Sequence, residues 1–328
     1  MALPNLHPPG VNILHLERAC YSDKALAKIK ACGNLSIPEI HTQEELQNLL
    51  QREEYDVIFT RLGLYLGEQE LRKQPNLKYI VTPTTGLNHL DMAYLDQRGI
   101  NVISLKGEAA FLSSIQSTAE HTWMLLLSLI RNLQPALAAV RQNIWDRVPF
   151  LAEELNTRTL GIVGFGRLGK ILLRYARAFE MEVLLHDIDE AALTKESLPF
   201  QTDLDSLLAQ SDYVLLQADY RESNRHFFGK SHFQKMKKGA YFINTARGEL
   251  VNETALLEAL RSGQLRGAAL DVLDGDSAWK TAPAGHPLIA YARQNDNLLI
   301  TPHMGGYGRI SIKKTRDFIT DKWINTPG

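Results

Sequence analysis

The chain has 328 residues, a length typical of two domains that each bury a hydrophobic core. Its 36 lysine and arginine residues nearly balance 37 aspartate and glutamate residues, which disfavours a nucleic acid or an acidic membrane as partner. Cys20 and Cys32 cannot form a disulfide framework and lack metal-type spacing, which favours a reducing, cytoplasmic compartment and no metal. The longest apolar run, around Trp123 to Ile130, is too short to span a bilayer.

Short apolar runs alternate with helical patterns in the first hundred residues. The runs predict strands over 11–16, 56–60, 79–82 and 102–105, with helices over 23–32 and 42–51. Ser22 is a predicted N-cap, and Thr42 with Glu45 has the spacing of a capping box. This alternation predicts a small α/β domain with a parallel sheet.

A second alternation follows a long helical region over 114–141. Its part AEHTWMLLLSLI is apolar nearly all round, so we expect burial on several sides. Residues 159–173 read as a strand, a glycine turn and a helix. Further strands over 182–188, 213–219, 240–246 and 267–273 complete a doubly wound sheet. The run 298–303 is another strand-like segment, and an amphipathic helix is predicted over 310–324.

The sequence GFGRLG, residues 164–169, follows an apolar strand and opens a helix, as a dinucleotide-binding turn does. Its glycines permit a tight turn, a close approach of the backbone to a pyrophosphate, and close packing of helix on strand. Asp187, after the next strand, would bind the ribose hydroxyls and repel a 2′-phosphate, which favours NAD. Arg167 or Lys170 could attract such a phosphate, so NADP stays open. The predicted cofactor-binding residues here are Gly164, Gly166, Arg167, Leu168, Gly169 and Asp187.

Three polar residues supply what hydride transfer to a 2-oxo acid requires besides nicotinamide. Arg247 follows a strand, and its guanidinium can grip a carboxylate and a carbonyl together. His303 follows another strand and can exchange a proton near neutral pH. Asp276 could pair with His303 and orient its ring. Each residue alone is more often a surface or turn residue, but together they predict a catalytic set.

These segments resemble the D-isomer-specific 2-hydroxyacid dehydrogenase family from about Pro75 to the C-terminus. The similarity is carried by TLGIVGFGRLGK, INTARGELVNETALLEAL, GAALDVL and NLLITPH, in the family's order and spacing. Weaker matches are PNLKYIVTPTTGLNHLD, QRGINVISLKG and STAEHTWMLLLSLIR. The first seventy residues match only in expected architecture.

The resemblance implies a role for several residues. Arg247 would bind substrate and His303 would be the acid/base, while Asp276 stands where the family usually has glutamate. The backbone amides of Leu87 and Asn88 would bind the substrate carboxylate. Asp271 and the carbonyl of Thr245 would face the nicotinamide carboxamide.

The resemblance also implies the domain organisation and the assembly. A flavodoxin-like substrate domain would comprise 1–105 and 298–328, with a Rossmann NAD-binding domain inserted at 106–297, both doubly wound parallel sheets. The apolar helix around Trp123 to Ile130 would form a homodimer. The implied reaction is hydride transfer between NAD(H) and C2 of a small 2-hydroxy or 2-oxo acid.

Three departures from the family pattern bear on specificity. The segment 107–120 is longer than usual, and Gln217-Ala218-Asp219 stands where a His-x-Pro element is common. Tyr307 and Arg309, with Arg61 and Lys106, could add positive charge around the substrate, which suggests a sugar-derived or phosphorylated acid. Ordinary surface charge explains them equally well.

Two other functions stay open. The same fold serves as a non-catalytic NAD(H)-sensing interaction protein, whose mark would be loss of a triad member, and all three positions here carry workable side chains. An enzyme of this fold could also act on another small anion, such as formate or a phosphonate. The His-carboxylate pair argues against formate, for which no proton need be supplied.

Overall fold

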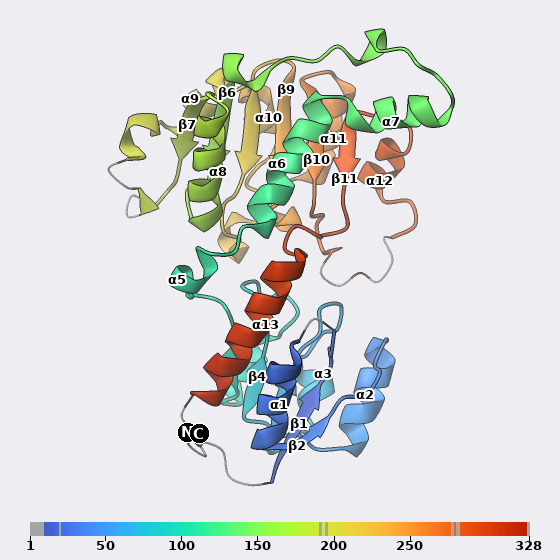
Figure 1. Cartoon of the computed structure of the whole chain (residues 1–328), viewed down its shortest axis with the longest axis vertical. Helices are drawn as coiled ribbons and strands as arrows, with labels where there is room; N and C mark the ends of the chain where they lie inside the picture. The colour runs from blue at the N-terminus through green and yellow to red at the C-terminus, as the bar shows by residue number, and fades with distance from the viewer. Residues whose placement is uncertain are drawn as a thin grey trace. The chain divides into compact units, whose positions relative to one another are not determined.

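The chain was analysed as a computed structural model, which describes residues 10–19, 21–189, 192–193, 196–276, 279 and 283–326. Cys20 therefore lies outside the described residues. The chain divides into two compact units (Figure 1). The first comprises Met1–Ser114, Ser277–Lys280 and Gly308–Gly328, and the second comprises Ile115–Asp276 and Thr281–Tyr307.

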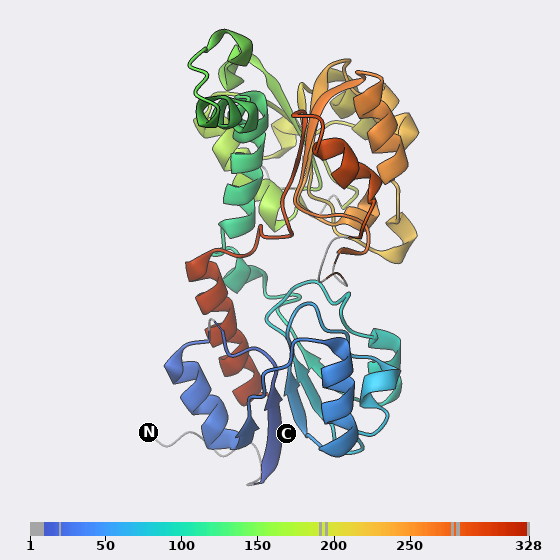
Figure 2. The same cartoon turned by 90° about the vertical axis from the view of Figure 1, so that its right-hand side faces the viewer.

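The first unit is built on a five-stranded parallel sheet in the order β2-β1-β3-β4-β5. This is the flavodoxin-like order that was predicted. One side carries α1 and α13, which contact each other, and the other side carries α2 and α3 (Figure 2). The elements are β1 (Val11–His15), α1 (Asp23–Cys32), β2 (Gly33–Ser36), α2 (Gln43–Arg52), β3 (Val57–Phe59), α3 (Glu68–Leu71), β4 (Tyr79–Val81), α4 (Met92–Gln97), β5 (Asn101–Ile103), α5 (Ala109–Leu112) and α13 (Arg309–Ile324).

Local signals fixed the starts of α1 and α2. The Ser22 hydroxyl accepts from the Ala25 amide at 3.1 Å, and Thr42 and Glu45 form the predicted capping box. Strand β2 was not predicted because it is a four-residue edge strand with one large apolar side chain, Leu35. It forms through backbone pairing with β1, which no local pattern reveals.

The second unit contains a six-stranded parallel sheet in the order β11-β10-β9-β8-β6-β7. Gln201 forms a single parallel bridge with Leu185 of β7, so a reduced third Rossmann strand lies at that edge. The order reverses between β6 and β8, which is where doubly wound sheets bind ligands. The strands are β6 (Thr159–Val163), β7 (Glu182–His186), β8 (Tyr213–Leu216), β9 (Ala240–Asn244), β10 (Leu265–Leu270) and β11 (Leu298–Ile300).

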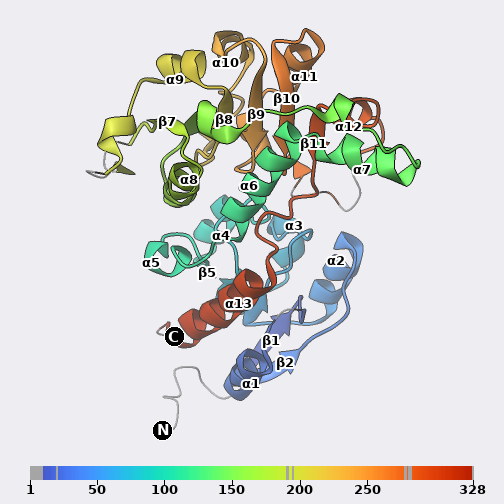
Figure 3. The same ribbon diagram turned by 45° about the horizontal axis from the view of Figure 1, so that its top comes forward.

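Helices cover both faces of this sheet (Figure 3). α6 and α8 contact each other on one face, and α9, α10 and α11 form the other layer. The core is largely aliphatic, and it contains the buried face of α6 and the strands β6, β7 and β8. The helices are α6 (Ser117–Ile130), α7 (Leu133–Arg141), α8 (Arg167–Ala178), α9 (Leu204–Gln210), α10 (Lys230–Lys235), α11 (Glu253–Arg261) and α12 (Pro287–Ala292).

The predicted long helix over 114–141 is wrong in one respect, because it is two helices. Asn132 has a left-handed φ of 51°, and α6 and α7 meet there at a bend of 64°. The expected burial of α6 is confirmed for most of its length, although Met124 is exposed.

The predicted domain boundaries also differ from the units. Strand β11, assigned by sequence to the substrate domain, pairs in parallel with β10 of the second unit. The return of the chain to the first unit therefore follows Tyr307 rather than residue 297. The first crossing lies between Ser114 and Ile115 instead of near Lys106, because Phe111 of α5 stacks on Phe318 of α13, with ring centroids 3.8 Å apart.

Among the described residues, no single helix is both long and apolar enough to cross a membrane. α6 and α7 reach that length and composition only when they are counted together across their bend.

Candidate active site

The glycine turn after β6 has the geometry that a dinucleotide phosphate requires. Gly164 has a φ of 98°, and a Cβ there would lie 2.5 Å from the Ala218 amide nitrogen. A Cβ on Gly169 would lie 2.6 Å from the Gly164 carbonyl oxygen. A Cβ on Gly166 meets nothing within 4 Å, so this glycine opens onto space at the start of α8. The turn thus fits a pyrophosphate at a helix N-terminus.

Asp187 is anchored to this turn. Its carboxylate accepts from the Phe165 amide at 2.5 Å and from the Asp189 amide at 2.8 Å. The Arg167 guanidinium donates a hydrogen bond to the Ile115 carbonyl oxygen at 2.7 Å. Burial lowers the pKa of Arg167. The contact of Asp187 with ribose stays a prediction, as does the contact of Leu168 with phosphate.

A buried asparagine shapes the turn that presents Arg247. The Asn244 side chain accepts from the Ala246 amide at 3.0 Å and donates to the Arg247 carbonyl at 2.9 Å. Gly248 then passes so close to the chain that a Cβ would lie 2.2 Å from the Leu273 carbonyl oxygen. The guanidinium of Arg247, which is partly buried, donates to the Ala246 carbonyl at 2.6 Å. Arg247 is therefore fixed at the carboxyl end of β9.

The structure brings His303 and Asp276 together. The Nδ1 atom of His303 lies 3.1 Å from the Asp276 carboxylate, although the two residues are 27 positions apart. Asp276 also accepts from the Leu273 amide at 3.1 Å. Aspartate, although one methylene shorter than glutamate, therefore reaches the His303 ring. The His303 side chain is 41% exposed, so a ligand can reach this side chain.

Asp271 holds the backbone that carries His303. The Asp271 carboxylate accepts from the Thr301 hydroxyl at 2.6 Å and from the amides of Met304 and Gly305 at 2.9 and 2.7 Å. His121 Nε2 lies 3.1 Å from the same carboxylate. Burial raises the pKa of Asp271, but these hydrogen bonds outweigh it and hold the pKa below its usual range.

Thr245 and Gln217 belong to a group of buried, hydrogen-bonded polar side chains near the point where the strand order reverses. The Thr245 hydroxyl lies 2.7 Å from the Thr122 hydroxyl and accepts from the Gln217 side chain at 2.9 Å. The Gln217 side-chain oxygen is buried, and it has no hydrogen-bond partner among the residues that the structure describes. Gln217, which departs from the family pattern, therefore places a polar group at the edge of the glycine turn, next to Gly164.

In the first unit, a short series of hydrogen bonds shapes the loop that contains Leu87 and Asn88. His89 is buried, and its Nε2 lies 3.0 Å from the Thr82 hydroxyl. That hydroxyl lies 2.9 Å from the Thr84 hydroxyl, which donates to the Gly86 carbonyl at 2.8 Å. Leu87 is partly buried and Asn88 is exposed.

The four polar residues that are expected around the substrate are distributed over both units. Arg61 and Lys106 follow β3 and β5, the strands on either side of β4. Arg61 donates to the Ile40 carbonyl at 2.6 Å, and Lys106 is exposed. Tyr307 and Arg309 are exposed near the end of the return crossing, in different units.

The second unit matches a described protein family over residues 123–305, the D-isomer specific 2-hydroxyacid dehydrogenase, NAD binding domain. The chain belongs to the D-isomer specific 2-hydroxyacid dehydrogenase family. Its second unit is an NAD-binding domain, so the cofactor predicted from the glycine turn is confirmed. The predicted fold of two doubly wound parallel-sheet units is confirmed as well.

Individual members of the family show how far the similarity extends. The chain is 32% identical to D-3-phosphoglycerate dehydrogenase of Methanocaldococcus jannaschii over 86% of its own length but only 51% of that protein. It is 31% identical to glyoxylate reductase of Thermofilum pendens, over 86% of this chain and 82% of that protein. A structure of D-lactate dehydrogenase from Aquifex aeolicus with NAD and lactic acid has a TM-score of 0.79, with 29% identity, 95% of this chain and 94% of that chain covered.

Sequence reasoning missed the residues that shape the site rather than face it. The side chains of Asn244, His121 and His89 are buried. Asn244 bonds to backbone atoms, His121 to residues far away in the sequence, and His89 to the Thr82 hydroxyl seven residues earlier. A buried histidine on an apolar helix gives no local signal of its partner. The one available signal is position, because Asn244 immediately precedes the turn that carries Arg247.

Proposed function

We propose that the chain is an enzyme that transfers a hydride between NAD(H) and C2 of a 2-hydroxy or 2-oxo acid of D-type stereochemistry. The observation that carries this proposal is the His303–Asp276 contact of 3.1 Å in a unit that also holds the glycine turn and Arg247. A histidine paired with a carboxylate is suited to exchange a proton with a hydroxyl group.

In the reductive direction, each residue has a distinct task. Arg247 grips the carboxylate and polarises the oxo group, because a guanidinium donates two parallel hydrogen bonds. The amides of Leu87 and Asn88 hold the same carboxylate. His303, oriented by Asp276, donates a proton to the oxygen on C2. Bound NADH supplies the hydride.

The remaining cofactor contacts are proposed from position. The backbone of Gly166, Arg167 and Leu168 at the start of α8 holds the pyrophosphate, and Asp187 holds the ribose. The Thr245 carbonyl and Asp271 follow β9 and β10. We propose that both face the nicotinamide carboxamide.

The proposed substrate class rests on the charges around the loop after β4. Arg61 and Lys106 flank that loop at the carboxyl ends of the neighbouring strands. Two cations favour an acid with additional polar or anionic groups, such as a sugar-derived or phosphorylated acid. Two relatives are named for acids of this kind. They are D-3-phosphoglycerate dehydrogenase of Methanocaldococcus jannaschii and hydroxypyruvate reductase of Thermotoga maritima.

The deciding experiment follows NADH oxidation at 340 nm by wild type and His303→Ala across a panel of 2-oxo acids, including sugar-derived and phosphorylated ones. We expect turnover of at least one acid and a loss of about 10³-fold in His303→Ala, because a positioned acid contributes about 10²–10⁴-fold. NADH affinity, measured by fluorescence, stays unchanged. Tight NADH binding without turnover of any acid would instead support the non-catalytic NAD(H)-sensing alternative.

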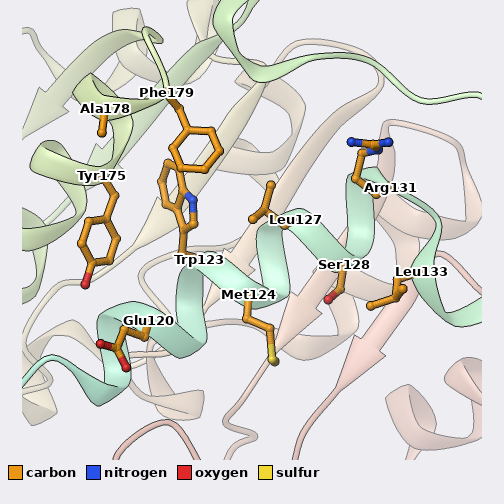
Figure 4. A pocket seen from close by; sticks show the side chains of 10 residues that line it. All are labelled: Glu120, Trp123, Met124, Leu127, Ser128, Arg131, Leu133, Tyr175, Ala178 and Phe179. Carbon is orange, nitrogen blue, oxygen red and sulfur yellow. The ribbon is translucent and has the colours of Figure 1, made fainter.

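We also propose that the chain forms a homodimer through α6, α7 and the segment that follows them. Trp123, Tyr175 and Phe179 line an apolar groove of about 690 Å³ between α6 and α8 (Figure 4). Beyond it, Trp145 is 91% exposed in the segment after α7. Exposed apolar surface of this extent is typical of a protein interface. The large exposed apolar residues of this surface are Met124, Leu133, Leu137, Val140, Ile144, Trp145, Val148, Leu151 and Phe179.

We propose a second copy as the occupant, because the exposed apolar segment after α7 and the groove lie in the same unit and can exchange between two identical chains. Trp145→Glu with Leu151→Glu should convert a dimer to a monomer in sedimentation-velocity measurements. Leu198→Glu, which introduces the same charged side chain once at an exposed apolar residue outside this surface, is the control. A wild-type chain that sediments as a monomer would refute the proposal.

The proposed compartment is the cytoplasm. It rests on the cysteine content, since Cys32 is a free thiol and the chain has only one other cysteine. Cell fractionation of the tagged chain tests it, and recovery in an oxidising compartment would contradict it.

A further inference from the structure

The turn that carries His303 is held from one side by helix α6. His303 has a left-handed φ of 52°, which is uncommon for a residue with a side chain. The Ser117 hydroxyl donates to the Gly305 carbonyl at 2.7 Å. A Cβ on Gly305 would lie 2.9 Å from the Asp271 carboxylate and 3.6 Å from the His121 ring. The turn is therefore pressed between Asp271 and α6.

His121 is the residue of α6 that contacts the anchor of this turn. Its side chain is 8% exposed, and its Nε2 lies 3.1 Å from Asp271 Oδ1 and 2.9 Å from the Thr301 hydroxyl. The Asp271 backbone carbonyl in turn accepts from the His303 amide at 2.8 Å. Hydrogen bonds at the side chain and at the backbone of Asp271 thus connect α6 to the backbone of His303.

We propose that His121 is a positioning residue, which holds the Asp271 carboxylate and through it sets the orientation of the His303 ring toward Asp276. This inference rests on the proposed function, because it assigns His121 to the site at which His303 exchanges a proton. His121 itself contacts no reacting atom in this proposal.

The physical reason is that the Asp271 carboxylate has to face four donors at once. The Thr301 hydroxyl and the amides of Met304 and Gly305 all come from the turn itself, whereas His121 comes from a rigid helix. Without His121, the carboxylate can shift, since none of the other described residues outside the turn donates to it, and Ser117 holds the turn only at the Gly305 carbonyl. Such a shift changes the orientation of the His303 ring, because its 3.1 Å contact with Asp276 depends on the positions of both side chains.

The test reads the His303 ring directly by long-range ¹H–¹⁵N NMR correlation, which reports the protonated ring nitrogen without any substrate. His303→Gln assigns the signal. In wild type we expect the proton on Nδ1, held by Asp276. In His121→Phe, which keeps a ring but removes the donor, we expect a redistribution toward the other nitrogen. His121→Gln, which restores a donor, should return the wild-type pattern.

Two further variants keep the test sharp. Thr301→Val removes a different donor to Asp271 and should shift the His303 ring in the same direction, even if His121→Phe folds poorly. His226→Phe is the matched control, because His226 contacts another carboxylate, Asp274, at 2.7 Å. We expect no change of the His303 signals in that variant. A wild-type pattern in a folded His121→Phe protein overturns the proposal.

Kinetics distinguish this proposal from the proposed function. If an acid is turned over, His121→Phe should lower kcat about 10-fold or more with little change in NADH affinity, because misplacement of a reacting group is costly. If no acid is turned over but the ring signals depend on His121, the positioning proposal stands and the proposed reaction fails. If turnover needs His303 but not His121, the reaction stands and the positioning proposal fails.

Discussion

The loop after β4 in the first unit and the turn after β11 in the second are held by the same pair of residue types. His89 contacts the Thr82 hydroxyl at 3.0 Å, and His121 contacts the Thr301 hydroxyl at 2.9 Å. The two networks end differently, because the first passes through Thr84 to a neutral backbone carbonyl and the second ends on the Asp271 carboxylate.

This difference fits what each segment is proposed to do. The loop of the first unit offers backbone amides to a substrate carboxylate, and a buried negative charge beside it would repel that substrate. The turn of the second unit has to fix a histidine, and a carboxylate with four donors is a stronger anchor than a neutral group. Neutral groups therefore shape the binding loop, and a charged group shapes the turn of the proton donor.

The largest expected effect is that of Asp271→Asn. The amide offers one oxygen in place of two and turns an N–H group toward donors, and each unmade buried bond costs about 1–3 kcal/mol. We expect the free energy of unfolding of the second unit to fall by about 3 kcal/mol and turnover to fall about 10²-fold. Urea unfolding and steady-state rates measure both.

Asp274→Asn is the control for this change, because Asp274 is a more exposed carboxylate that pairs with Arg225 and His226. It should affect stability by less than about 1 kcal/mol. Wild-type turnover in a folded Asp271→Asn protein would show that the charged anchor is not needed for His303.

The two units also differ in their response to acid. His15 is fully buried in the first unit, stacked on Phe59 with ring centroids 4.9 Å apart and edge-on to Tyr21 at 4.4 Å. Neither ring nitrogen has a hydrogen-bond partner among the described residues. Burial, with the nearby charge of Arg316, lowers the pKa of His15 from 6.5 to about 4.

The sign of the effect follows from which state binds the proton. Between pH 6.5 and about 4 the unfolded chain binds a proton at His15 and the folded chain does not, so stability falls as pH falls. The loss approaches about 3 kcal/mol at pH 4. In contrast, the lowered pKa of Asp271 keeps its carboxylate charged until more acidic pH. Urea unfolding at pH 7, 6 and 5 should show a loss in wild type that His15→Phe reduces. An equal loss in the variant would contradict this account.

Much of this organisation was predictable where the decisive contacts are local. The caps at Ser22 and Thr42 and the glycine turn at 164–169 are encoded within a few residues. The pairing of β11 with β10 was not, because a three-residue strand can join either sheet and only long-range backbone bonds decide. The contact of His303 with Asp276 was predicted from the chemistry that a catalytic histidine requires, whereas His121 looked like one more residue of a buried helix.

A third prediction tests why the loop of the first unit is neutral. Thr84→Asp would place a carboxylate beside Leu87 and Asn88, and unit charges a few ångström apart near a surface repel by about 1–3 kcal/mol. We expect the KM for the oxo acid to rise about 10-fold with little change in kcat. Thr84→Asn has nearly the same shape without the charge and should raise KM less. Equal KM values for the two variants would remove the electrostatic explanation.

The smallest expected effect is that of His89→Phe, which removes the contact with Thr82 and keeps a ring of similar position. A neutral hydrogen bond contributes about 1 kcal/mol, so we expect the KM for the oxo acid to rise about fivefold. kcat should hardly change, because this loop binds the substrate carboxylate in the ground state and the transition state alike. His89→Gln should restore most of the affinity. A fall in kcat at constant KM would mean that this loop also positions a reacting group, and the two networks would then serve the same purpose.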